Sequence, residues 1–134
     1  MLKRLFDFSL SLFGLIILLP ALFIISIGVV LTSKGGVIFS HRRVGRNDVD
    51  FYIYKFRTMH ANTDETSELT LGNLDPRITR FGRFLRKYKL DELPQLINVL
   101  IGEMSFVGPR PEVRKYVDNY TEEQLALLSV RPGI

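Results

Sequence analysis

A long apolar stretch opens the chain and is followed by shorter alternating and amphipathic segments. Residues 8–33 carry no charged side chain, and Pro20 lies near their middle. An apolar run of this length exceeds what a hydrocarbon core of about 30 Å requires, so the pattern predicts a membrane helix over residues 3–31. The proline removes one backbone hydrogen bond and predicts a bend. A secretory signal has a shorter apolar region, of about 7–15 residues, so we expect this helix to be retained.

Basic residues flank both ends of the apolar stretch. Lys3 and Arg4 precede it, and four cations follow it: Lys34, Arg42, Arg43 and Arg46. Because cytoplasmic flanks are enriched in lysine and arginine, this distribution predicts that both ends face the cytoplasm. Such a topology needs a re-entrant helix–break–helix, with the break at Pro20. A single span that tolerates its proline is an equal alternative on these observations.

The pattern changes to short strands after Gly36. Residues 37–39 and 51–56 are rich in β-branched and aromatic side chains, which predicts two strands of a small ribbon. The sequence GRND at residues 45–48 has turn chemistry and connects them. Residues 61–73 are polar without periodicity and predict a loop.

An amphipathic helix is predicted to follow the loop. Asp75 and Pro76 predict its start, with aspartate as the N-cap and proline in the first turn. One face of this helix is apolar and consists of Ile78, Phe81, Phe84, Leu85 and Tyr88. The other face is basic, which is typical of a helix that lies on a bilayer. A solvated basic face over a small core is the alternative.

Two further helices are predicted in the last third of the chain. The first covers residues 91–100 and ends before Gly102. Its expected buried face consists of Leu93, Leu96, Ile97 and Leu100. The second begins at Thr121, where Thr121 and Gln124 form a capping box, and it ends before Pro132.

Together these elements predict an α+β fold that is mainly helical. The 134 residues have room for a re-entrant membrane helix at residues 1–33 and one compact catalytic domain at residues 34–134. In that domain, amphipathic surface helices and the β-ribbon surround the site. The absence of cysteine excludes disulfides and thiolate metal sites. The turn-like end at Arg131-Pro132-Gly133 leads us to expect a piece of a longer protein.

The charge distribution narrows the possible partners. The formal net charge is +4, and six cations gather in residues 77–89, which contain no acid: Arg77, Arg80, Arg83, Arg86, Lys87 and Lys89. Such a block can meet nucleic acid, anionic lipid or a phosphorylated substrate. The chain has no nucleic-acid recognition motif and its start is apolar, so we expect no nucleic-acid partner.

Asp91 and Glu92 are the first candidates for chemistry. An acidic pair at a helix start most often serves only as a cap in the first turn. Here the pair directly follows the basic block, which could hold an anionic substrate against the helix start. A carboxylate nucleophile that attacks phosphorus needs this electrostatic help. A magnesium ion held by the carboxylates and by substrate phosphates would add to it.

A second candidate is Arg110, which lies between Pro109 and Pro111 in the sequence GPRP. The rigid backbone would present its guanidinium for bidentate phosphate binding, although a purely structural turn is equally consistent. His41 and His60 stand alone, and we assign neither a role. The chain contains no Walker loop, dinucleotide fingerprint or nucleophile elbow.

These motifs, taken in order, resemble the monotopic phosphoglycosyl transferases, which are also called bacterial sugar transferases. The resemblance spans the whole chain, beginning with the basic and then apolar start and its proline. It continues through YKFRTM (54–59), DPRITRFG (75–82), LDELPQLINVL (90–100), GEMSFVGPRP (102–111) and VRPGI (130–134). The run at residues 90–100 is the most specific part.

The resemblance implies an activity and residue roles. It implies transfer of a sugar phosphate from a UDP-sugar to a polyprenyl (undecaprenyl) phosphate, with release of UMP, at the start of exopolysaccharide, O-antigen or glycoprotein assembly. Asp91 would be the nucleophile that forms a covalent phosphosugar intermediate, and Glu92 would be associated with magnesium. Arg86 and Arg110 would act in phosphate binding and catalysis, and the membrane helix would be re-entrant at Pro20.

We further expect other residues of the matching motifs to contribute to substrate and phosphate binding, namely Lys55, Arg57, Pro109, Pro111 and Arg131. The expected location is the cytoplasmic face of the bacterial inner membrane, in contact with lipid. Neither the transferred sugar nor the oligomeric state follows from the sequence. The alternative is a membrane-anchored basic adaptor that binds anionic lipid or phosphorylated partners without catalysis.

Overall fold

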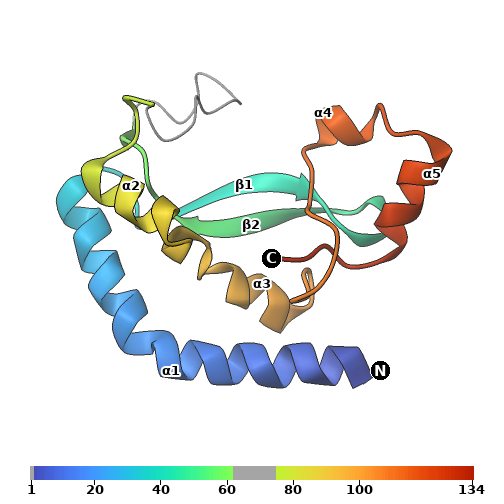
Figure 1. Ribbon diagram of the computed structural model, residues 1–134, viewed down its shortest axis with the longest axis horizontal. Coiled ribbons are helices and arrows are strands. Elements are labelled where there is room, and N and C mark those ends of the chain that lie inside the picture. Colours follow the sequence, from blue (N-terminus) through green and yellow to red (C-terminus); the bar gives the residue numbers. More distant parts are fainter. Residues whose placement is uncertain (1, 62–74) are drawn as a thin grey trace. The chain divides into compact units, whose positions relative to one another are not determined.

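A computed structural model describes residues 2–61 and 75–134, so residues 62–73 of the predicted loop lie outside the described part. The described residues are mainly helical with one two-stranded antiparallel sheet (Figure 1), which confirms the coarse fold class. The helices are α1 (Leu2–Thr32), α2 (Arg80–Lys87), α3 (Gln95–Ile101), α4 (Arg114–Val117) and α5 (Glu122–Leu125). The strands are β1 (Ile38–Val44) and β2 (Asp50–Phe56), and short 3-10 turns cover Arg46–Asp48, Leu90–Glu92 and Ala126–Ser129.

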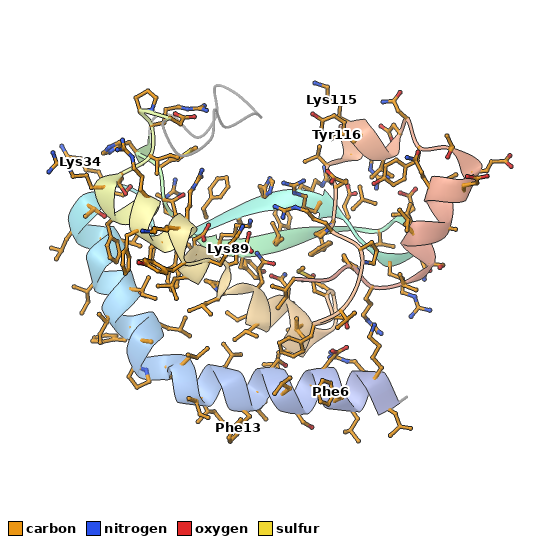
Figure 2. All side chains as sticks on the ribbon, viewed as in Figure 1. Phe6, Phe13, Lys34, Lys89, Lys115 and Tyr116 are labelled. Carbon is orange, nitrogen blue, oxygen red and sulfur yellow. The ribbon has the colours of Figure 1, made fainter. Side chains whose placement is uncertain are left out.

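Helix α1 confirms the long apolar helix predicted for the start of the chain. It has 31 residues and is long and apolar enough to cross a membrane, which indicates membrane association. Large apolar side chains project from it, such as Phe13 (Figure 2) and Phe23, which are 63% and 68% exposed. The helix continues through Pro20, because a proline removes one hydrogen bond and need not end a helix, and the bend at Pro20 stays a prediction. The re-entrant topology stays a prediction.

Contacts divide the chain into two compact units, and α1 contributes to both. The first unit contains Met1–Ile17, Ser40–Tyr54 and Gln95–Ile134, and the second contains Leu18–Phe39 and Lys55–Pro94. The predicted division into a membrane helix at residues 1–33 and a catalytic domain at residues 34–134 stays a prediction.

The core of the first unit lies between β2 and α3. Its buried members are Phe51, Ile53, Val99 and Met104, with Phe106 packed against them. The turn between the strands occupies Arg46–Asp48, as predicted, and both strands extend further toward it than the sequence indicated. The extension is possible because alternate residues of β1 are exposed, so polar side chains fit there.

Polar contacts fasten the beginning of α1 within the first unit. Arg4 donates hydrogen bonds to the carbonyl oxygens of Val99 (2.5 Å) and Leu100 (2.6 Å), near the end of α3. Asp7 is buried and accepts a hydrogen bond from the Ser105 hydroxyl at 2.9 Å. The last carbonyls of a helix have no partner within the helix, so Arg4 satisfies groups that would otherwise need water.

Helix α3 begins later than predicted and buries a different face. The predicted range of 91–100 is wrong at its start, because residues 90–92 form a separate 3-10 turn before Pro94. Ile97 is 41% exposed, whereas Asn98 is fully buried. The Asn98 amide donates to the Tyr52 carbonyl (2.7 Å) and accepts from the Tyr54 N–H (3.1 Å), which pairs the open backbone of β2. Asn98 is therefore buried because it pairs the backbone of β2, and hydrophobic periodicity could not predict a buried polar residue at this position.

The end of α3 and the start of α5 agree with the sequence, whereas the last predicted helix ends early: the α-helix stops at Leu125 and continues only as the 3-10 turn Ala126–Ser129. Gly102 follows α3 with a φ of +96°, a conformation that glycine adopts at little cost. The capping box of Thr121 and Gln124 is present at the start of α5. Helix α4 was not predicted, because its four residues are too few to show a period.

The second unit packs the later part of α1 against α2 and the end of β2. Ile25 and Val29 of α1 form a buried cluster with Phe56 and Leu85. The Ser33 hydroxyl, just after α1, donates a hydrogen bond to the Met59 carbonyl at 3.1 Å. Thus the end of α1, like its beginning, is fastened to residues of the later chain.

Helix α2 begins at Arg80, not at Asp75. Thr79 is its N-cap, and its hydroxyl accepts the Gly82 N–H at 2.8 Å. Asp75 is buried, and its carboxylate accepts the Arg77 backbone N–H at 3.0 Å and pairs with the Arg77 side chain, in a turn that precedes the helix. The predicted apolar face is only partly buried: Leu85 is fully buried, while Phe84 and Tyr88 are 49% and 56% exposed.

Candidate active site

The candidate nucleophile lies in the tight turn between α2 and α3. Lys89 has left-handed backbone angles (φ 58°), and it turns the chain from α2 into the 3-10 turn Leu90–Glu92. Figure 2 labels Lys89 at this position. Asp91 is 8% exposed, and its Oδ1 atom is buried without a hydrogen-bond partner among the described residues. A buried carboxylate oxygen without a partner is costly and calls for an explanation.

Lys55 and Glu92 form an ion pair beside Asp91. Lys55 lies near the end of β2, and its Nζ is 2.8 Å from Glu92 Oε1. Both side chains are largely buried, at 21% and 18% exposure. The strand end therefore brings a cation to the acidic pair, and the predicted role of Lys55 in phosphate binding stays a prediction.

Arg86 brings a second cation to the same turn. It lies in the last turn of α2, and its Nε donates a hydrogen bond to Thr58 Oγ1 at 2.8 Å. Its charge acts on the Asp91 carboxylate. Arg80, Arg83, Lys87 and Lys89 are exposed, whereas Arg86 is half-buried and lowers the pKa of Asp91.

The electrostatics of Asp91 reflect a balance of these neighbours. Burial raises the pKa of Asp91 above its ordinary value, and Lys55 opposes that shift. The Glu92 carboxylate raises the same pKa further, while Arg86 lowers it. Two cations thus support the ionised, nucleophilic form against burial and a neighbouring like charge.

The helix N-terminus predicted at Asp91 does not contribute in the way we expected. Asp91 lies in a 3-10 turn, four residues before the start of the seven-residue helix α3. The dipole effect is confined to the first turn of a helix. Side-chain cations therefore take the role that we had assigned to the helix start.

The acidic pair fits a magnesium ion that is shared with a substrate. No group of three or more metal-ligating side chains occurs in residues 2–61 and 75–134, so this part of the chain has no complete protein cage. Magnesium is commonly bound through one or two carboxylates together with substrate phosphates. Asp91 and Glu92 offer that donor set, and Asp91 Oδ1 is an oxygen without a partner.

The other predicted residue of the strand-end motif, Arg57, has different contacts. Its Nε donates to the Gly36 carbonyl at 2.9 Å, and its guanidinium lies over the Phe39 ring at 5.7 Å. These contacts hold the beginning of β1. A phosphate-binding role for Arg57 stays a prediction.

The first unit contains the Pro109–Pro111 turn, which is built on the end of the described chain. Ser105 donates its N–H to the Pro132 carbonyl at 2.8 Å, and Gly133 donates to the Pro109 carbonyl at 2.8 Å. Arg131 Nε donates to the Gly102 carbonyl at 2.7 Å, so its described contact supports the same turn. The motifs at residues 102–111 and 130–134 therefore form one substructure.

Arg110 is exposed at the rim of a small hollow beside this turn. The hollow is lined by Pro109, Arg110, Pro111 and Glu112, together with Val44, Gly45, Val117, Tyr120, Leu127, Leu128, Val130 and Pro132. Burial lowers the pKa of Arg43; Glu112 opposes this effect, and Arg110 adds to it. Arg43 is thus a second guanidinium near the turn, and the sequence analysis gave it no role.

In the second unit, Thr58 contacts Arg86 and is a polar residue for which the sequence predicts no role. It belongs to the motif YKFRTM, so its position in a specific motif was the available signal. Its contact with Arg86 joins residues that lie 28 positions apart. Neither hydrophobic periodicity nor the spacing of motifs in the sequence could predict this contact.

The chain matches a family model described as "Bacterial sugar transferase" over residues 1–134. It is 40% identical to an undecaprenyl-phosphate glucose phosphotransferase of Komagataeibacter xylinus, with 98% of this chain and 26% of the relative covered. It is 42% identical to an undecaprenyl-phosphate galactose phosphotransferase of Salmonella typhimurium, with 99% and 31% covered. It is 43% identical to the exopolysaccharide production protein ExoY of Sinorhizobium fredii, with 98% and 65% covered. The chain thus spans between 26% and 65% of the length of these relatives.

Replacing Asp91 with asparagine should stabilise the fold at neutral and alkaline pH. Because the folded pKa is raised, the stability that Asp91 contributes is present below its unfolded pKa of about 3.9 and is lost as the pH rises through the folded pKa. Asparagine is neutral at every pH. Thermal unfolding should therefore give Asp91→Asn a Tm several degrees higher at pH 8, and the difference should shrink as the pH falls toward about 4.

The exposed Asp118 offers a matched control, since Asp118→Asn changes the net charge equally. This variant should not raise the Tm in the same way. A Tm gain for Asp91→Asn that is absent at pH 8, or that grows toward acid pH, would contradict the electrostatic account of the site.

Proposed function

Because the chain belongs to the bacterial sugar transferase family, we propose that it transfers a sugar 1-phosphate from a UDP-sugar to polyprenyl phosphate and releases UMP. The observation that carries this proposal is Asp91, a buried carboxylate with an unpartnered oxygen whose pKa is lowered by two cations, Lys55 and Arg86, against the effect of burial. The names of the relatives support undecaprenyl phosphate as the acceptor and a sugar phosphate as the transferred group. One relative is named for exopolysaccharide production, which supports a role early in assembly of a bacterial glycoconjugate.

The first step is attack by an Asp91 carboxylate oxygen on the phosphorus that bears the sugar. The new O–P bond makes an aspartyl phosphosugar, and the bond from this phosphorus to the bridging oxygen breaks. UMP leaves with the electron pair and needs no proton. Since both reactants are anions, the step depends on neutralising charge at the phosphate.

In the second step a phosphate oxygen of the polyprenyl phosphate attacks the same phosphorus. The bond to Asp91 breaks, and the carboxylate returns to its ionised form. The product is a polyprenyl diphosphate sugar. The two steps leave the enzyme unchanged. Because UMP leaves before the polyprenyl phosphate reacts, this mechanism predicts ping-pong kinetics.

The cations of the site have separate roles in this mechanism. Lys55 pairs with Glu92 and lowers the pKa of Asp91, so it keeps the nucleophile ionised. Arg86 also favours the ionised form, and its planar guanidinium suits a phosphate that approaches Asp91. Arg110 would supply a further guanidinium from its rigid turn, as the family resemblance implies.

Asp91 and Glu92 would hold the magnesium ion together with the substrate diphosphate. When bound, the ion supplies positive charge that stabilises phosphoryl transfer. Glu92 holds its carboxylate beside the nucleophile through the 2.8 Å bond to Lys55. In this arrangement Glu92 would be a ligand of the magnesium ion, and Asp91 alone would attack the phosphorus.

We further propose that α1 is re-entrant, with both ends on the cytoplasmic face of the inner membrane. Arg4 and Asp7 fasten the beginning of α1 to residues 99–106, while Ser33 fastens its end to Met59. Outside α1, the described residues contain no helix that could span a membrane. Each end of α1 is thus held by residues of the later chain, which supports entry and return on one side of the membrane.

The central prediction is that the full-length protein forms a covalent adduct. UMP should appear on addition of a UDP-sugar without lipid acceptor, up to one equivalent per enzyme. Intact-mass measurement should detect an added phosphosugar that maps to Asp91. Asp91→Asn should show neither the adduct nor the UMP burst. Testing a panel of UDP-sugars in this assay would also identify the donor.

Other outcomes of this assay separate the alternatives. If UMP forms only when polyprenyl phosphate is present and no adduct accumulates, transfer is direct and Asp91 is not a nucleophile. If no UDP-sugar yields UMP while the protein binds anionic lipid equally with and without Asp91→Asn, the protein is an adaptor.

The magnesium assignment predicts a specific defect in Glu92→Gln. This variant should lose most of its activity, and the magnesium concentration for half-maximal rate should rise, because the amide replaces a charged oxygen ligand. A magnesium titration of the UMP burst measures both quantities. Glu103→Gln provides a control with the same change of charge in the first unit. An unaltered magnesium response in Glu92→Gln would contradict the assignment.

The topology can be tested with single cysteines, since the chain has none of its own. Lys3→Cys and Lys34→Cys should both be protected from a membrane-impermeant maleimide in spheroplasts, and both should react after permeabilisation. Lys115→Cys serves as the cytoplasmic reference. Labelling of one end from outside would contradict the re-entrant arrangement. Adding Pro20→Leu should favour a full span and expose one end.

A further inference from the structure

Thr58 makes two different kinds of contact with α2. Its backbone carbonyl accepts the Thr79 N–H at 2.9 Å, next to the start of the helix. Gly82 lies so close to it that a Cβ atom there would be 2.8 Å from Thr58 Cα. These backbone contacts fix the start of α2 and do not depend on the Thr58 side chain.

The Thr58 side chain has a separate contact. The residue is 6% exposed, and its Oγ1 accepts the hydrogen bond from Arg86 Nε at 2.8 Å. A guanidinium is planar and rigid, so one well-placed bond at Nε restricts the direction of its terminal nitrogens. A hydrogen bond from a charged donor is also stronger than one between neutral groups.

We propose that Thr58 is a positioning residue that holds the Arg86 guanidinium in register with Asp91 for phosphoryl transfer. The inference rests on the proposed function, in which Arg86 binds the phosphate that Asp91 attacks. Thr58 itself touches no reacting atom in this account. Its hydroxyl acts through Arg86, and its backbone holds the helix that carries Arg86.

Two substitutions separate the hydroxyl from the shape of the side chain. Thr58→Val keeps the branched shape and the backbone contacts but removes the acceptor. It should slow the single-turnover UMP burst by about 10- to 100-fold, the range expected for loss of a hydrogen bond to a charged group. Thr58→Ser keeps the hydroxyl and should retain a rate close to that of the wild type. Should Thr58→Val not fold, Thr58→Ala removes the same hydroxyl.

A matched control comes from Thr79, the N-cap of α2. Its hydroxyl accepts the Gly82 N–H and not Arg86. Thr79→Val should therefore lower the Tm and affect the burst rate much less than Thr58→Val does. Thermal unfolding of all variants reports the structural part of each effect.

The decisive measurement is a double-mutant cycle that combines Thr58→Val with Arg86→Ala. The rate at which the aspartyl adduct accumulates is measured for each variant of the full-length protein. If Thr58 acts through Arg86, Thr58→Val should cause no further loss in the Arg86→Ala background. The same fold loss in both backgrounds, an equal loss in Thr58→Ser, or an unchanged rate in Thr58→Val would overturn the positioning role. A wild-type enzyme that forms neither UMP nor adduct would instead overturn the proposed function.

Discussion

The ionisation of Asp91 links the chemistry of this protein to its packing. Burial favours the neutral acid, and the adjacent Glu92 does the same, so the ionised form that the proposed mechanism requires depends on Lys55 and Arg86. Lys55 is placed by the end of β2, and Arg86 by α2 and its bond to Thr58. Phe56 and Leu85, the immediate neighbours of these two cations in sequence, belong to one buried cluster. The hydrophobic core of the second unit therefore sets the charge environment of the carboxylate.

The same cluster connects the site to the membrane helix. Ile25 and Val29 of α1 pack against Phe56 and Leu85, so the later part of α1 forms one wall of this core. Displacement of α1 would loosen the residues that carry Lys55 and Arg86. A membrane segment that only anchored the protein would not need this packing. The helix thus has a structural role beside the candidate site in addition to its proposed role in the membrane.

Much of the architecture followed from the sequence, because it depends on local signals. The apolar run, the two strands, Gly102 and the capping box at Thr121 are each encoded within a few residues. The errors arose where long-range polar contacts override local preference. Asp75 resembles an N-cap but pairs with Arg77, which leaves capping to Thr79. Asn98 resembles a surface residue of an amphipathic helix but pairs the backbone of β2 from within the core.

The candidate site was predictable in part for the same reason. Asp91 and Glu92 are adjacent and belong to a specific motif, so sequence alone could select them. Their environment could not be predicted in this way, since it depends on Lys55, which is 37 positions from Glu92.

The expected helix N-terminus proved to be a 3-10 turn, and this changes how the site is supported. A helix dipole is a property of many peptide units and resists single substitutions. Stabilisation of the ionised carboxylate by Lys55 and Arg86 can be changed by substituting either cation, or by substituting Thr58, which contacts Arg86. In the proposed mechanism, the reactivity of Asp91 is therefore set by a few identifiable side chains, and Thr58 acts on it only through Arg86.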